Sequence, residues 1–347
     1  MFDARRRIFA FLSWCSGAAF ALAISVLANY LSANEEARDP DQLVTTAVLL
    51  AASTALATGA FVARPNPARR GIILFVGLPD WGLRWPNKAM DYSSRRLVLN
   101  RFISRTLSGP GDLRNDQTTS LVGTLLSREQ EDIDEASKPH LPQTILISMP
   151  TPLAFILGAR LRAISNSVVL QERINYHPFR RSPFFESVDL RRRPTGKVGR
   201  GTEKQLKAQR LLSRPGHAKN VAVIVTVSQD SIKGPAIEHA AANGCDEIFV
   251  VDCSSTDRVL KETTRNYRSI FEWLYRELFH YVDELIDRAT AAGQRLPKFS
   301  LYIKTPVSIA FALGVEFRQR VEFDCYYIYR GRAYLTSGPE HHTEDPQ

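Results

Sequence analysis

Hydroxyl and amine side chains gather at two points where an apolar run gives way to a helix that begins with proline. The first corner is Ser148-Met-Pro-Thr151, and the second is Lys304-Thr-Pro-Val-Ser308. A helix N-terminus binds phosphate and other anions through free backbone N–H groups and the helix dipole, and proline fits there because its missing N–H is not needed. The second corner is better equipped, since Pro152 removes a backbone donor from the first. Anion binding is the chemistry predicted for Ser148, Thr151, Lys304, Thr305 and Ser308.

Two more corners follow the apolar runs that open each half of the soluble part. They are Gly77–Trp81, after residues 71–76, and Ser228–Lys233, after residues 221–227. In open α/β sheets a ligand binds beyond the carboxyl ends of the strands, so all four corners are expected to line one pocket. Trp81 and Trp85 are candidates to stack on a base, although burial of each against the sheet or the linker is favoured. The candidate ligand-binding set therefore also includes Trp81, Ser228 and Lys233.

A long internal repeat connects the two proline corners. Residues 147–162 align without a gap on residues 303–318, and seven of the sixteen positions are identical. This similarity predicts that one α/β module was duplicated, because the unit is too long for a solenoid. Two copies side by side would form a pocket with approximate two-fold symmetry. Such a pocket suits a ligand that is itself roughly two-fold or cyclic.

Each copy of the repeat places a glycine inside a helix, at Gly158 and Gly314. Glycine costs about 1 kcal/mol relative to alanine at such a position. Close packing of the helix onto the sheet is the expected reason.

Alternating strand and helix patterns predict an α/β fold with mostly parallel sheets covered on both faces. The second module is expected to have strands at 221–227, 247–252, 299–303, 325–329 and 333–336, and helices at 234–242, 256–292 and 306–319. The first is expected to have strands at 71–76, 144–148 and 168–174, and helices at 93–107, 118–136 and 150–164. The expected division is 1–66 for the membrane hairpin, 71–177 and 220–337 for the modules, 178–219 for a basic linker and 338–347 for a polar tail.

Two uncharged apolar stretches, at about 8–31 and 43–63, are each long enough to cross a bilayer. The loop between them is acidic, whereas arginines flank the outer ends. The positive-inside rule therefore predicts a multi-pass helical hairpin with both termini and the soluble part in the cytoplasm. A cleaved signal peptide is the alternative for the first stretch, and it would leave the second as an anchor with the same orientation.

Small residues recur every four positions in both stretches. They are Gly17, Ala21 and Ser25 in the first, and Ala47, Ala51, Ala55, Gly59 and Ala63 in the second. This spacing lets helix backbones approach closely, either within the hairpin or between subunits. An alanine-rich helix without such a contact is the alternative.

The net charge of +9 is concentrated between Pro178 and Asn220, where twelve basic residues face three acidic ones. This stretch is interpreted as a flexible connector, which lies near anionic lipid or attracts a polyanionic ligand. It lacks the interleaved aromatic residues that stack on bases, so binding to a nucleic-acid polymer is not expected.

Sequence signals for catalysis are absent. No nucleotide-binding glycine loop, nucleophile elbow or zinc motif occurs, and the four cysteines lack metal-ligand spacing. Asp252 and Asp257 form a conceivable carboxylate pair, although strand-end and helix-cap roles are favoured. The protein is therefore expected not to be an enzyme and to use no cofactor or metal. A membrane-tethered α/β hydrolase, or a ring nuclease that degrades the protein's own cyclic ligand, is the alternative.

The paired Pro-x3-Ala-Phe-x-Leu-Gly helices, with Tyr326-Tyr-Ile-Tyr329 followed by Tyr334, resemble SAVED domains. The resemblance covers residues 71–337 and is strongest over 220–337, because the first module lacks an evident match to Glu247–Asp252. With two spans ahead of it, the chain is similar to membrane-anchored SAVED effectors of CBASS antiphage operons. The resemblance implies a fusion of two CARF-like modules that binds a cyclic di- or trinucleotide made by a partner cyclase. It further implies a location in the bacterial inner membrane, ligand-driven self-association, and disruption of the lipid bilayer by the spans, leading to abortive infection.

Overall fold

A computed structural model describes residues 2–32, 40–63, 70–78, 81, 84–97, 99–114, 123, 143–160, 167–173, 182–213, 218–227, 231–253, 262–317, 321 and 323–337. The chain divides into two compact units. One comprises Met1–Arg69 with Ser94–Val98, and the other comprises Arg70–Ser93 with Leu99–Gln347.

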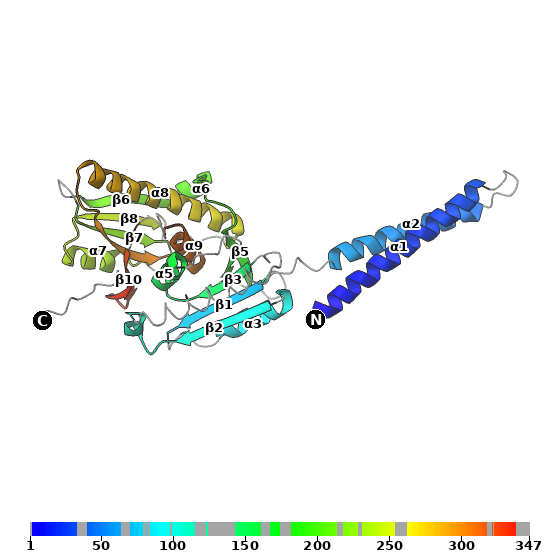
Figure 1. Ribbon diagram of the computed structural model, residues 1–347, viewed down its shortest axis with the longest axis horizontal. Coiled ribbons are helices and arrows are strands. Elements are labelled where there is room, and N and C mark those ends of the chain that lie inside the picture. Colours follow the sequence, from blue (N-terminus) through cyan, green and yellow to red (C-terminus); the bar gives the residue numbers. More distant parts are fainter. Residues whose placement is uncertain are drawn as a thin grey trace. The chain divides into compact units, whose positions relative to one another are not determined.

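The N-terminal helices α1 (Phe2–Ser32) and α2 (Pro40–Ala63) pack against each other as a hairpin (Figure 1). Each contains a segment apolar and long enough to cross a membrane, Phe11–Ser32 in α1 and Asp41–Gly59 in α2. These segments overlap the two stretches predicted from the sequence.

Paired serines join the two helices of the hairpin. Ser16 Oγ donates to the carbonyl of Ser53 at 3.0 Å, and Ser53 Oγ donates to the carbonyl of Ser16 at 3.1 Å. Most of the small-residue stripe lies away from this seam. Gly59 packs against Leu12 of the other helix. Six other residues of the stripe are exposed, namely Gly17, Ala21, Ser25, Ala47, Ala51 and Ala55. Those six residues therefore do not form the contact within the hairpin.

The first sheet has the strand order β2-β1-β3-β4-β5. The first four strands in this order run parallel, and β5 is antiparallel to β4. Its elements are β1 (Arg70–Gly77), α3 (Arg84–Arg96), β2 (Leu99–Thr106), η3 (Pro110–Arg114), β3 (Gln143–Ser148), α5 (Thr151–Arg160), β4 (Ser167–Glu172) and β5 (Phe184–Asp189).

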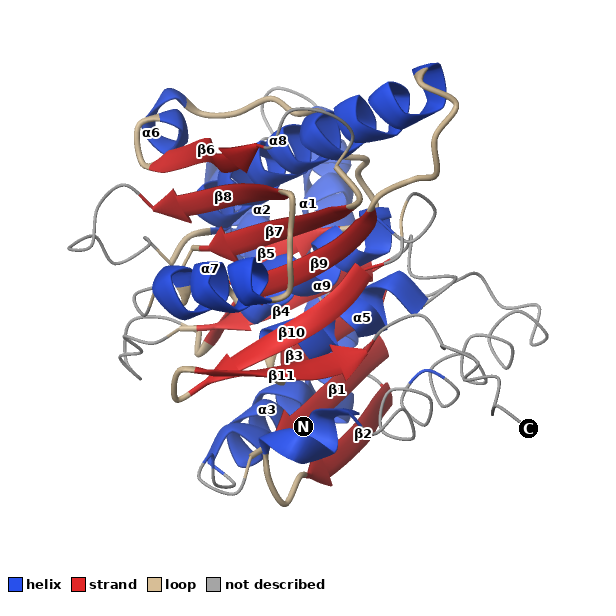
Figure 2. Cartoon of the chain, turned by 90° about the vertical axis from the view of Figure 1, so that its left-hand side faces the viewer, coloured by secondary structure: helices blue, strands red, loops and turns tan. Residues whose placement is uncertain are grey.

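The second sheet has the order β11-β10-β9-β7-β8-β6, with antiparallel strands at both edges. Its elements are α6 (Arg200–Glu203), β6 (Leu206–Ser213), β7 (Asn220–Thr226), α7 (Lys233–Ala242), β8 (Glu247–Cys253), α8 (Thr264–Ala291), β9 (Lys298–Lys304), α9 (Val307–Phe317), β10 (Phe323–Tyr329) and β11 (Arg332–Ser337). Figure 2 looks onto this sheet, with α7 on the near face and α8 and α9 on the far face.

The two sheets repeat one topology. The order β2-β1-β3-β4-β5 corresponds to β8-β7-β9-β10-β11, strand for strand and with the same directions. The helices α5 and α9 occupy equivalent places, after β3 and after β9. The predicted α/β fold of a helical pair followed by two duplicated, mostly parallel sheets is therefore confirmed, and β2 is the counterpart of Glu247–Cys253 that the sequence did not reveal.

Two predicted helices differ from the structure, and a third lies almost wholly outside the described residues. Residues 99–106 form the edge strand β2, not part of a helix over 93–107. The helix α8 begins at Thr264, where Thr263 Oγ1 caps it by accepting from the backbone N–H of Asn266 at 3.2 Å. Residues 256–261, where this helix was expected to begin, lie outside the described residues, as does the expected helix over 118–136 apart from Gly123.

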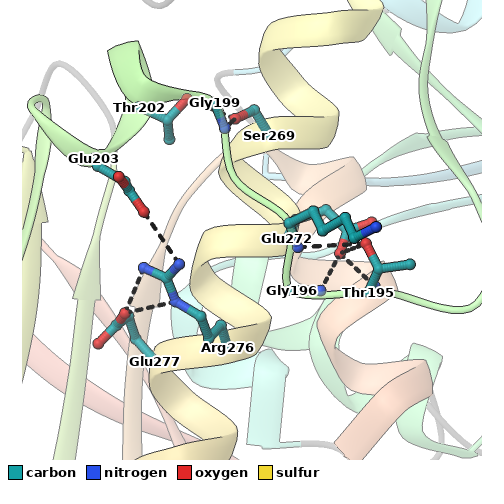
Figure 3. A network of polar contacts seen from close by, with 10 residues as sticks. Thr195, Gly196, Gly199, Thr202, Glu203, Ser269, Glu272, Arg276 and Glu277 are labelled. Carbon is teal, nitrogen blue, oxygen red and sulfur yellow. Dashed lines mark hydrogen bonds and ion pairs between the residues drawn. The ribbon is translucent and has the colours of Figure 1, made fainter.

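The interpretation of residues 178–219 as a flexible connector is wrong over 182–213. Strands β5 and β6 extend the two sheets, and the segment 195–203 between them is fixed along α8 (Figure 3). The buried carboxylate of Glu272 accepts from the backbone N–H groups of Thr195 (2.6 Å) and Gly196 (2.7 Å). Arg276 pairs with Glu203 at 3.2 Å. We call residues 195–203 the strap.

Candidate functional site

The two repeat helices cross each other at their glycines. A Cβ atom on Gly158 would collide with the carbonyl oxygen of Phe311, and a Cβ atom on Gly314 would collide with that of Phe155. Both helices are buried around almost their whole circumference, as expected for a helix that is apolar all round, and they lie side by side between the two sheets (Figure 1). The prediction that these glycines pack onto a sheet is wrong, because each packs onto the other module's helix.

The N-terminus of each repeat helix is hydrogen-bonded to the other module. Thr151 Oγ1 of α5 donates to the carbonyl of Ile303 in β9 at 2.6 Å. Ser308 of α9 is fully buried and donates to Gln171 Oε1 in β4 at 2.9 Å, while its Oγ lies 2.7 Å from Ser187 Oγ in β5. The two helix N-termini and the carboxyl ends of β3, β4 and β9 are therefore held close together.

The second proline corner contains a buried hydroxyl without a partner. Thr305 is 3% exposed, and within the described part of the chain its Oγ1 makes no hydrogen bond. The same holds for Thr226, the last residue of β7, which is the register partner of Lys304. Buried polar groups without partners are uncommon in native proteins, and a ligand is one of the causes. We call the region of Ser148, Thr151, Thr226, Lys304 and Thr305 the carboxyl-edge site.

Lys233 lies at the edge of this region but is already paired. Its Nζ is 2.5 Å from Asp252 Oδ2, near the end of β8, and Asp252 is the register partner of Thr226. Asp252 is therefore an ion-pair partner at a strand end, as favoured from the sequence. The charge of Lys233 is partly neutralised, so it is a weaker anion ligand than its sequence position suggested.

The remaining sequence candidates fall into two groups. Ser148 and Lys304 are half-buried at the last positions of β3 and β9. Trp81 follows the carboxyl end of β1 and is 38% exposed, so it is not wholly buried against the sheet. Ser228 lies outside the described residues. Ser308 lies at the site, but its hydroxyl is already hydrogen-bonded to Gln171 and Ser187 of the first module.

An arginine at the carboxyl end of β4 was not among the sequence candidates. Arg173 donates through NH1 to the carbonyl of Glu262, its guanidinium lies 4.5 Å from the centre of the Phe185 ring, and its buried Nε has no partner among the described residues. Tyr267 packs edge-on against Phe185 at 4.9 Å. Burial, followed by the charge of Glu262, raises the pKa of Tyr267 to about 12, so this phenol stays neutral. These contacts attach the start of α8 to the first module.

Thr226, Gln171 and Ser187 were also missed by the sequence analysis. Thr226 had a usable signal, since it ends a buried parallel strand next to another candidate corner. Gln171 and Ser187 had none, because their role depends on a contact between residues more than 100 positions apart. Among the described residues, no group of three or more His, Cys, Asp or Glu side chains is arranged to hold a metal ion.

Comparison with known proteins gives matches to solved structures alone. No protein-family model and no curated protein matches the chain. Solved structures that resemble it include receptors with a SAVED/CARF domain.

One is the Cap4 receptor of Acinetobacter baumannii with the cyclic trinucleotide 3'3'3'-cAAA, at 14% identity and a TM-score of 0.44, covering 85% of this chain and 60% of that one. The same receptor with 2'3'3'-cAAA has 14% identity and a TM-score of 0.45, with coverages of 86% and 60%. The Cap4 receptor of Moraxella osloensis has 14% identity and a TM-score of 0.42, with coverages of 85% and 58%. The chain thus spans 58–60% of the length of these receptors.

Proposed function

We propose that this protein is a membrane-anchored receptor for a cyclic di- or trinucleotide and an effector of antiphage defence. The observation that carries the proposal is the crossing of α5 and α9, which brings two helix N-termini and the carboxyl ends of two duplicated sheets to one place. Helix N-termini attract phosphate, and ligands of open α/β sheets bind at the carboxyl edge. Two such corners, one from each module, suit a ligand with repeated phosphates on a closed ring.

The two halves of the carboxyl-edge site are not chemically equal. The second half has Lys304 and the unpartnered Thr305 hydroxyl, whereas the equivalent positions of the first half are Ser148 and Met149. Two phosphates of a cyclic ligand would therefore be bound with different strength. Trp81 supplies an exposed ring on which a base can stack.

The effector step is self-association of the membrane hairpins. Receptors that assemble upon binding bring their spans together at high effective concentration, so that weak helix contacts suffice. The ligand must bind the assembled form more tightly than the free form. The small residues exposed outside the hairpin seam, such as Ala51 and Ala55, suit close packing between neighbouring hairpins. We propose that such clusters disrupt the inner membrane, with both termini and the soluble part in the cytoplasm, and that infected cells abort.

Binding rather than turnover is the proposed activity. The Asp252 carboxylate is paired with Lys233, and no catalytic group accompanies the carboxyl-edge site among the described residues. A membrane-tethered hydrolase or ring nuclease acting on the same ligand remains the alternative, and recovery of the nucleotide after incubation distinguishes it.

The test uses the full chain in lipid nanodiscs and a panel of cyclic di- and trinucleotides, with linear oligonucleotides of the same composition as controls. Cyclic triadenylates head the panel because they are the ligands in two of the solved receptor complexes. Thermal stability, particle mass and the integrity of the nucleotide are followed together. Dye release from liposomes containing the protein then measures membrane disruption.

One cyclic compound that raises stability, promotes assembly and is recovered intact would support the proposal. Cleavage of the compound would favour the enzyme alternative. No response to any cyclic compound would overturn the receptor function, and binding without dye release would overturn the effector step alone.

A further inference from the structure

Three consecutive arginines follow the last strand of the first sheet. Because β5 is antiparallel to β4, its last residue, Asp189, pairs with Val168 near the start of β4. The next residue, Leu190, donates its N–H to the carbonyl of Ser167 at 3.0 Å. The run Arg191–Arg193 therefore lies at the amino edge of the first sheet, opposite the carboxyl edge with its candidate ligand site.

The chain enters the first sheet at this same edge. The strand β1 begins at Arg70, which is the register neighbour of Gln143 at the start of β3. Six residues, 64–69, separate Arg70 from Ala63 at the end of α2. A chain of this length reaches at most about 25 Å when fully extended. The amino edge is thus the edge at which the polypeptide arrives from its second apolar helix.

The charges of the three arginines are only partly compensated. Arg191 pairs with Asp189 at 2.7 Å, and Arg192, whose side chain is 65% exposed, is 3.4 Å from the same carboxylate. Arg193 is exposed and makes no hydrogen bond or ion pair within the described residues. The Asp189 carboxylate is therefore shared by Arg191 and Arg192, and the charge of Arg193 has no ion-pair partner among the described residues. We call Arg191, Arg192 and Arg193 the arginine surface.

The arginine surface is held in place on both sides. Strand β5 precedes it, and the strap follows directly, fixed to α8 by Glu272, Ser269 and Arg276 (Figure 3). A charged segment that is already ordered loses less conformational entropy on binding than a free tail does. A flexible basic linker would not have this advantage.

We propose that the arginine surface binds the anionic headgroups of the membrane in which the hairpin is anchored. Guanidinium groups bind phosphate in a fork geometry, and each cationic side chain close to an anionic leaflet strengthens binding by about fivefold. Docking of the amino edge leaves the carboxyl-edge site facing away from the lipid, where a soluble ligand can reach it. This inference rests on the proposed membrane anchoring, but not on the identity of the ligand.

The test is hydrogen exchange of the full chain in nanodiscs of neutral phosphatidylcholine or of phosphatidylcholine with phosphatidylglycerol. The variant Arg192→Gln/Arg193→Gln removes two charges and only one contact, the 3.4 Å pair with Asp189. The matched control is Arg330→Gln/Arg332→Gln, which removes two exposed arginines at the turn after β10, at the opposite edge of the second sheet. Stable incorporation into the discs reports the membrane anchoring independently of the arginine surface.

The expected result is slower exchange of peptides covering 189–197 in anionic discs than in neutral discs. This protection should disappear in high salt and in the double variant, whose docking equilibrium is weakened by about thirtyfold, and it should persist in the control. Equal exchange in the two kinds of disc, or undiminished protection in the double variant, would overturn the proposal. So would protection by single-stranded RNA in neutral discs without any effect of anionic lipid, which would assign the surface to nucleic acid.

Discussion

Gly158 lies directly against the backbone carbonyl of Phe311, and the same contact recurs with the modules exchanged, between Gly314 and Phe155. The four residues occupy equivalent places in the repeat, 156 positions apart. The contact has the form of an isologous interface, in which residue i touches j and the equivalent of j touches the equivalent of i. The duplicated modules therefore pack like the two subunits of a symmetric dimer joined in one chain.

Alanine at Gly158 or Gly314 is expected to destabilise the fold, although alanine favours helix by about 1 kcal/mol. The added methyl group meets rigid backbone, not a movable side chain, and overpacking of this kind costs about 1–3 kcal/mol or more. Thermal unfolding of the purified protein should show a lower midpoint for each variant. Because both changes push the same two helices apart, their effects should not be additive.

Gly234→Ala is the matched control for this prediction. Gly234 lies in helix α7, and a Cβ atom there meets nothing within 4 Å. This substitution should leave stability unchanged or raise it slightly. Equal midpoints for Gly158→Ala and Gly234→Ala would contradict the close crossing of α5 and α9.

The repeat predicted which helices are equivalent, but not what they touch. Periodicity marks a helix that is apolar all round as buried, and it does not say whether a sheet or another helix covers it. The packing partner of Gly158 was therefore assigned wrongly, whereas the strands of the second module, which are continuous apolar runs such as Val221–Val227, were placed within a residue or two. Long-range pairing carries information that local pattern does not contain.

Edge strands account for most of the missed secondary structure. In β2, Leu99, Phe102 and Ile103 are spaced three and four residues apart, as on a helix face, and Phe102 is 43% exposed because one side of the strand is open. In β6 the basic side chains of Lys207 and Arg210 hide the strand pattern. Charged residues are common on edge strands because they discourage further pairing. Composition thus suggested a linker where the structure has a strand.

The candidate site was only partly predictable for a similar reason. Strand ends before helix N-termini located Lys304 and Thr305 correctly at the carboxyl edge. The same rule could not separate hydroxyls that hold the modules together, such as that of Ser308, from hydroxyls left without a partner. That distinction depends on the neighbouring module, which only the fold brings into contact.

Ser308→Ala is expected to lower stability because it removes a buried hydroxyl that joins two strands of the other module and leaves the buried Ser187 hydroxyl without this partner. Gln171 and Ser187 both contact the Ser308 hydroxyl where α9 meets β4 and β5; Ser308 and Ser187 are buried and Gln171 is half-buried. Unpaired buried groups of this kind cost about 1–3 kcal/mol. Thermal unfolding measures the loss, with Thr290→Ala as a control, since Thr290 is exposed and bonds only to its own helix. A midpoint for Ser308→Ala as high as that of the control would refute the structural role of this hydroxyl.

Thr305→Val is expected to weaken ligand binding without lowering the stability of the protein. The substitution keeps the shape of a buried side chain and removes a hydroxyl that has no partner in the described chain, so stability should stay equal or increase. Affinity for the cyclic nucleotide should fall by about fivefold to tenfold if this hydroxyl contacts the ligand, as one hydrogen bond is lost. Isothermal titration measures the affinity.

The same substitution at Thr151 is the control for Thr305. Thr151→Val removes the hydrogen bond to the carbonyl of Ile303, so it should lower stability by about 1 kcal/mol. Undiminished affinity in Thr305→Val would exclude this hydroxyl from the ligand site. Destabilisation of Thr305→Val by as much as Thr151→Val would show that Thr305 has a structural partner instead.

The stability of the second module is expected to depend on pH through His239. Its Nδ1 lies 2.8 Å from the hydroxyl of Tyr302, and burial lowers the pKa of His239 below its usual value of 6.5. The unfolded chain therefore binds a proton more readily than the folded chain, and stability must fall as the pH drops below about 6.5.

His239→Gln keeps a hydrogen-bonding side chain without a titrating ring, so this part of the pH dependence should vanish. Tyr302→Phe keeps the imidazole and should retain a slope while lowering stability by about 1 kcal/mol. Thermal midpoints measured between about pH 5 and 8 decide the matter, and a His239→Gln profile parallel to that of the wild type would rule out His239 as the titrating group.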